Sequence, residues 1–102
     1  MVDPHTRHVR KSLYTPANKS LLKLLREVRK EAGLTQAQLA QRLDVLQSEV
    51  SNWERGEKRL DLIELCEIVD AINLPLNRFV ERFEAMAGRG LTDSSAHGQG
   101  KK

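Results

Sequence analysis

Four polar side chains at helical spacing in the segment 47–55 are the residues best suited to binding a ligand. On a helical wheel, the amides of Gln47 and Asn52 share one side of this segment. The hydroxyls of Ser48 and Ser51 fall on the same side. A carboxamide donates and accepts together, which matches the edge of adenine in the major groove of duplex DNA. Such residues are also common on any exposed helix, so a plain solvent-facing surface is the alternative interpretation.

Residues that could support catalysis or bind a metal are sparse. The single cysteine, Cys66, falls on the apolar face of a predicted helix, where a small buried hydrophobe is more common than a nucleophile. His5 and His8 lie in an aperiodic stretch without further metal donors nearby. We therefore expect no enzyme, no cofactor and no metal.

Composition favours a small cytoplasmic domain with a basic N-terminal third. The 102 residues include one cysteine and only 4% aromatic residues, which argues against stacking platforms for single-stranded nucleic acid. Residues 1–30 carry eight Lys or Arg against two acidic residues, whereas the whole chain has a net charge of +3. This basic third suits a polyanionic partner, and a solubilising tail is the alternative. Neither a signal peptide nor a membrane-spanning segment is expected.

Capping residues and turn formers predict five helices. Thr15 before Pro16 has the residue types of a helix start, and Thr35 with Gln38 matches a capping box. Asp61 and Glu64 repeat that box. The predicted helices cover residues 15–32, 35–43, 47–55, 61–72 and 75–87.

Each predicted helix carries an apolar stripe that is expected to face a common core. The expected inward residues, helix by helix, are Leu21, Leu25, Val28 and Ala32; Leu39, Ala40 and Leu43; Val50 and Trp53; Leu62, Leu65, Cys66, Val69 and Ile72; and Leu76, Phe79, Val80 and Phe83. The sequence thus predicts an all-α, compact five-helix domain over residues 15–87. A flexible basic arm is expected over residues 1–14 and a disordered tail over residues 88–102.

The second and third predicted helices are short and leave only Asp44, Val45 and Leu46 between them. A tight turn of this kind holds two helices at a steep angle and presents the second one as a projecting ridge. The major groove admits one such helix, so the polar side of residues 47–55 could reach base edges.

The stretch 22–83 resembles the Xre/Cro-like, or phage-repressor-like, helix-turn-helix DNA-binding family. The matching blocks are residues 33–40, 47–56 and 60–72, which together form several separate motifs. The resemblance implies a five-helix repressor-like DNA-binding fold that reads DNA with its second and third helices.

The resemblance also implies roles for individual residues. Base edges are expected to meet Gln47, Ser48, Ser51 and Asn52. Backbone phosphates are expected to meet Gln36, Arg55, Lys58 and Arg59. Arg29 and Glu54 are expected to form a structural, partly buried ion pair, in which losing one partner costs more than the pair contributes.

Three positions depart from the family pattern. Leu46 stands where the family usually has a Ser or Thr cap, which costs about 1 kcal/mol unless Leu46 packs inward. Asp44 replaces a turn glycine but tolerates the left-handed conformation better than most residues. Glu49 adds an acid to the flank of the recognition helix. These departures bear on affinity and on the DNA sequence that is read, and leave the fold unaffected.

The leading hypothesis is a sequence-specific regulator of transcription, a repressor that binds double-stranded DNA as a homodimer. Phe79, Val80, Phe83 and Met86 form a stripe that could close the core or leave a remainder for the dimer. One alternative is an antitoxin-type regulator that also binds a partner protein such as a toxin. Another is a protein-interaction module on the same fold.

Overall fold

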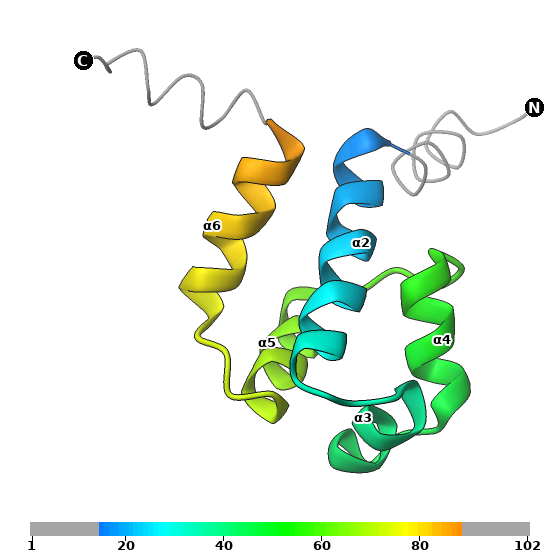
Figure 1. Cartoon of the computed structure of the whole chain (residues 1–102). Coiled ribbons are helices and arrows are strands. Elements are labelled where there is room, and N and C mark those ends of the chain that lie inside the picture. Colours follow the sequence, from blue (N-terminus) through cyan, green and yellow to red (C-terminus); the bar gives the residue numbers. More distant parts are fainter. Residues whose placement is uncertain (1–14, 89–102) are drawn as a thin grey trace, which may run out of the picture.

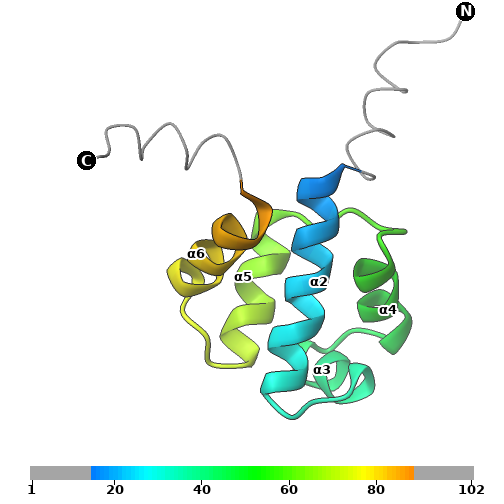
Figure 2. The same cartoon turned by 45° about the horizontal axis from the view of Figure 1, so that its top comes forward.

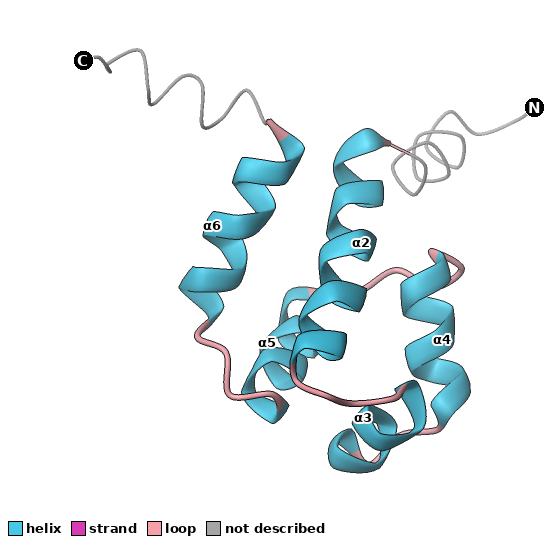
Figure 3. Ribbon diagram, viewed as in Figure 1, coloured by secondary structure: helices cyan, strands magenta, loops and turns pink. Residues whose placement is uncertain are grey.

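The computed structural model describes residues 15–88, which fold into helices joined by short loops (Figure 3). The helices are α2 (Pro16–Glu31), α3 (Gln36–Leu43), α4 (Gln47–Arg55), α5 (Leu62–Ala71) and α6 (Leu76–Ala87). Residues 15–88 contain no strand, so the predicted all-α fold is confirmed. The predicted arm over residues 1–14 lies outside the described residues, as does the predicted tail beyond Gly88.

Helix α2 runs through the middle of the domain and organises the other helices (Figures 1 and 2). It packs against α4 on one side and against α6 on the other. Helix α3 packs against both α4 and α5, near the C-terminal end of α2. This arrangement leaves one side of α4 facing away from the body of the domain.

Local sequence signals account for the helix boundaries. Thr35 Oγ1 accepts from the backbone of Gln38 while the Gln38 side chain accepts from the backbone of Thr35, so this predicted capping box is confirmed. The box of Asp61 and Glu64 is also present, and Thr15 caps α2. Asp44 ends α3 in the left-handed region at φ 60°, which a short polar side chain tolerates.

Every helix contributes to a single apolar core. The fully buried hydrophobic residues are Leu24, Leu25, Val28, Leu39, Ala40, Val50, Trp53, Ile68, Val69 and Phe79. The expected inward positions Leu65, Ile72, Leu76 and Phe83 are partly buried against this cluster.

Three predicted core positions, Leu62, Ala32 and Val80, were wrong because all three are exposed. Leu62 is 63% exposed because the buried face of α5 centres on Ile68 and Val69 rather than on Leu62. Ala32 is exposed because it lies at the C-cap, one residue beyond the last turn of α2. Cys66 and Val80 also lie at the edges of their faces, Cys66 half-buried and Val80 39% exposed.

No helix within residues 15–88 is both long enough and apolar enough to cross a membrane.

Candidate nucleic-acid interface

The inner side of α4 anchors this helix on the rest of the domain. Val50, Trp53 and Glu54 are 1%, 4% and 2% exposed, and all three lie on one side of the helix. Two of them join the apolar core, while Glu54 enters an ion-pair network with α2. This packing fixes the rotation of α4 about its own axis, so the opposite side of the helix faces outward.

The four polar residues singled out from the sequence lie on this outer side. Gln47 and Ser48 are exposed in the first turn, and Ser51 and Asn52 are half-buried one turn further on. They form a continuous polar ridge along α4. Each of the four side chains carries both a donor and an acceptor, which is suited to the edges of bases.

Arg55 organises the C-terminal half of this ridge. Its Nη1 donates to Ser51 Oγ, and its Nη2 donates to Asn52 Oδ1 at 2.8 Å. Nη2 also donates to Glu57 Oε1 at 3.1 Å. The hydrogen bond and the charge of Glu57 raise the pKa of Arg55, and the same contact lowers the pKa of Glu57. The guanidinium thereby sets the orientation of two polar side chains on the ridge.

Lys58 forms a second charged contact next to α4. Its Nζ donates to Glu49 Oε1 at 2.6 Å, and this hydrogen bond raises the pKa of Lys58. The same ammonium lies 5.9 Å from the ring centre of Trp53. Glu49 thus meets a lysine from the following loop, a contact that spacing along the helix does not predict. Arg59 lies exposed in that loop.

Glu54 is the centre of a buried polar network that joins α2, α3 and α4. Arg29 donates to it through Nε at 2.7 Å and through Nη2 at 3.0 Å. Gln36 Nε2, from the first turn of α3, donates to Glu54 Oε1 at 2.9 Å. The structure therefore brings Arg29 and Glu54 together as a bidentate pair and adds Gln36, which the sequence interpretation reserved for phosphate.

Arg26 belongs to the same network, and sequence reasoning missed it. Its Nε lies 3.7 Å from Glu54 Oε1, while its side chain is 47% exposed. Burial alone raises the pKa of Glu54, but the hydrogen bonds from Arg29 and Gln36 and the two arginine charges outweigh it and lower the pKa. The position of Arg26, three residues before Arg29 on one helix face, is the signal that was available.

Leu46 is an exposed apolar residue at the start of α4, next to the polar ridge. It occupies the N-cap of α4, makes no side-chain cap hydrogen bond, and is 74% exposed. It therefore does not pack inward, so the cost expected for an uncapped helix is not offset by burial.

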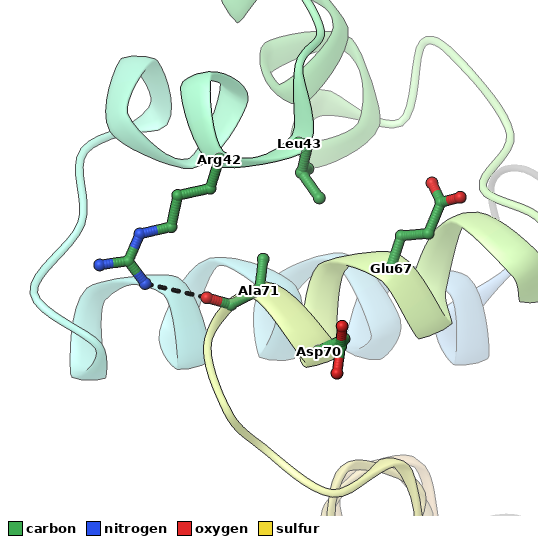
Figure 4. Close-up of a pocket in the computed structure, with 5 residues that line it drawn as sticks. All are labelled: Arg42, Leu43, Glu67, Asp70 and Ala71. Carbon is green, nitrogen blue, oxygen red and sulfur yellow. Dashed lines mark hydrogen bonds between the residues drawn. The ribbon is translucent and has the colours of Figure 1, made fainter.

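A hollow of about 270 Å³ lies between α3 and α5, away from the polar ridge. It is lined by Arg42, Leu43, Glu67, Asp70 and Ala71 (Figure 4). Arg42 Nη1 donates to the Ala71 carbonyl oxygen at 2.9 Å, at the C-terminal end of α5, where a cation is favourable. Within residues 15–88, no group of three potential metal ligands lies together. We therefore assign the hollow to the packing contact between α3 and α5.

Known proteins match the chain in sequence and in structure. A family model described as helix-turn-helix matches residues 25–79. A solved structure of an XRE-family like protein from Pseudomonas syringae pv. tomato str. DC3000 is 37% identical in sequence. Its alignment covers 82% of this chain and 98% of that chain, with a TM-score of 0.64. No curated protein matches the chain.

Proposed function

The chain belongs to the XRE-like helix-turn-helix family of DNA-binding regulators, and we propose that it is a sequence-specific repressor that reads the major groove with α4. The observation that carries the proposal is the polar ridge of Gln47, Ser48, Ser51 and Asn52, backed by a fully buried inner side. A recognition helix needs both properties, because its exposed side must meet bases while its other side keeps it in register.

Asn52 is the residue for which the geometry supports base reading best. Its Oδ1 already accepts one hydrogen bond from Arg55, which holds the amide in a single orientation. One lone pair of Oδ1 and both amide protons remain for a base. That set is sufficient for a bidentate pair with adenine, so Arg55 acts as a positioning residue for Asn52.

Phosphate contacts are proposed for Gln36, Arg55, Lys58 and Arg59. Gln36 uses one amide proton on Glu54, so a second proton remains for a phosphate at the first turn of α3. Arg55 and Lys58 are paired with Glu57 and Glu49 in the free protein. A phosphate would compete with these exposed carboxylates, and Arg26 adds a further cation beside Gln36.

We also propose that two copies bind a two-fold related site, which requires half-sites about 34 Å apart. In the predicted apolar stripe of α6, Phe79 is buried and Phe83 packs on the core, which leaves Val80 and Met86 at 39% and 36% exposed. Leu62 and Ile63 in the first turn of α5 are 63% and 67% exposed and are better candidates. The antitoxin-type alternative predicts that a second protein covers this pair.

Selection of bound sequences from a random duplex pool tests the proposal. Recovery of one motif with two-fold symmetry is the expected result. Recovery of a motif without symmetry would contradict the dimer but not DNA reading. If no duplex is retained even at low salt, the proposed function is wrong and an interaction module on this fold becomes the better interpretation.

A further inference from the structure

Leu46 is an exposed leucine at the tip of the helix that is proposed to enter the groove. Its side chain is 74% exposed, which is the largest exposed fraction among the large hydrophobic residues of the described chain. It immediately precedes Gln47 and Ser48, the first two residues of the polar ridge. The N-terminal residues of a recognition helix are the ones that come closest to base edges.

The packing of the domain does not require an apolar side chain at this position. Val45, the preceding residue, supplies the apolar contact of the turn and packs against the core. The backbone carbonyl of Leu46 accepts from Glu49 N at 2.9 Å, an interaction that any residue provides. With 74% of its surface exposed, Leu46 contributes little packing to the turn.

The leucine at residue 46 also takes the place of a residue that could cap α4. Helices α2, α3 and α5 are capped by the side chains of Thr15, Thr35 and Asp61. Helix α4 has no side-chain cap, although a hydroxyl at residue 46 would supply one. An exposed apolar side chain thus replaces a stabilising polar one at the tip of the recognition helix.

From these observations, and resting on the proposed function, we infer that Leu46 is a specificity-determining residue that packs against the 5-methyl group of a thymine in the major groove. This methyl is the apolar feature of the groove, and it distinguishes thymine from cytosine and from the other bases. Contact with it removes apolar surface of both partners from water. Leu46 would then read an apolar group next to the polar contacts of Gln47 and Ser48.

Replacing single thymines of the selected site with deoxyuridine tests the inference, because this change removes the methyl group and preserves base pairing. One thymine in each half-site is expected to respond. Replacing a single such thymine with deoxyuridine should lower the affinity of the wild-type chain by about fourfold, the factor expected for one buried methyl-sized group. The Leu46→Ser variant should bind the thymine and deoxyuridine duplexes equally. The Leu46→Met variant, which remains apolar, should retain most of the difference.

Two controls separate the contact from effects on folding. Leu46→Ser should raise the midpoint of thermal unfolding by about 4–8 °C, because serine restores the missing cap in a small domain. Val80→Ser changes an exposed apolar residue of α6 and should leave the ratio between the two duplexes unchanged.

The outcomes distinguish this inference from the proposed function. A selected site without a preferred thymine, or wild-type binding that ignores every methyl group, would overturn the inference while DNA reading stands. A Leu46→Ser variant that keeps the full fourfold difference would also overturn it. Absence of binding to any duplex at low salt would overturn the proposed function itself.

Discussion

At the scale of single residues, the main feature is that most polar side chains near the ridge have intramolecular partners. Arg55 holds Ser51 and Asn52, and Glu54 holds Gln36. Side chains that are already oriented lose less conformational entropy when they bind. The free protein therefore has part of its DNA-reading surface arranged in advance.

Removing Asn52 and removing Gln36 should have different effects. Asn52→Ala should weaken binding to the preferred site by about 1–3 kcal/mol and change binding to random DNA little. Gln36→Ala should weaken both, because phosphates are present at every sequence. Titrations of the two variants against a selected and a scrambled duplex measure the affinities to be compared. Equal effects on both duplexes would contradict the division into base and phosphate contacts.

Glu54 should make the stability of the domain depend on acid pH. Its pKa in the folded chain lies below its ordinary value of 4.5, so the folded state binds fewer protons than the unfolded state in that range. The resulting stability is complete above about pH 4.5 and is lost as the pH falls through the pKa of the folded state. Urea unfolding between pH 3 and pH 7 measures it.

The variant Glu54→Gln provides the control for this titration. Its stability should change less than that of the wild type below about pH 4.5, because glutamine does not titrate. It should also be less stable at pH 7, since Arg29 is only 7% exposed and would be left without its carboxylate partner. A wild-type acid response that persists unchanged in Glu54→Gln would assign the effect to other carboxylates.

At the scale of secondary-structure elements, sequence reasoning succeeded where local chemistry decides the structure. The bounds of α3 and α4 follow from a capping box, from Asp44 and from Gly56, all of which act within a few residues. Sequence reasoning failed at Leu62. Whether this residue faces the core depends on how α5 is turned about its own axis against the neighbouring helices. The helical wheel describes periodicity but does not fix this rotation.

Sequence reasoning did not identify the carboxylate partners of Arg26 and Lys58, for a similar reason. Lys58 meets Glu49 only because the loop after α4 folds back along the helix. Arg26 meets Glu54 only because α2 and α4 pack side by side. Such pairs join different elements, so the spacing of charges within one helix can show a shared face but does not identify the partner.

Gly33 and Gly56 allow a matched test of helix termination. Both have nearly the same positive φ, 78° and 77°, so alanine at either position should cost about 1–2 kcal/mol. A Cβ at Gly33 would meet nothing within 4 Å, whereas one at Gly56 would lie 2.8 Å from Leu22 Cδ1. Gly56→Ala should therefore unfold at a lower urea concentration than Gly33→Ala. Equal midpoints would mean that the Leu22 side chain moves aside without cost.

At the scale of the whole molecule, the proposed phosphate contacts predict a strong dependence on salt. With about six such contacts, the affinity for duplex DNA should fall by roughly 10³-fold between 50 and 200 mM salt. Arg59→Ala should reduce the slope of log affinity against log salt by about one for each bound chain. Fluorescence anisotropy over a salt series provides the measurement. A slope near zero would contradict binding through phosphates.

The proposed dimer can be tested independently of DNA. Light scattering of the purified chain should give twice the mass of one copy at high concentration. Replacing Ile63, which is 67% exposed, with glutamate should reduce the mass to one copy and leave the chain folded. A single-copy mass for the wild type at all concentrations would mean that pairing requires DNA or another protein.

Trp53 gives the domain a built-in optical reporter. It is the only tryptophan of the chain, its ring is 4% exposed, and its indole Nε1 has no hydrogen-bond partner. An indole in such apolar surroundings emits at a shorter wavelength than one in water, so unfolding shifts the emission to the red. Because the Lys58 ammonium lies over the same ring, a phosphate that draws Lys58 away should also change the emission. Folding and DNA binding can thus be followed through one native side chain without an attached label.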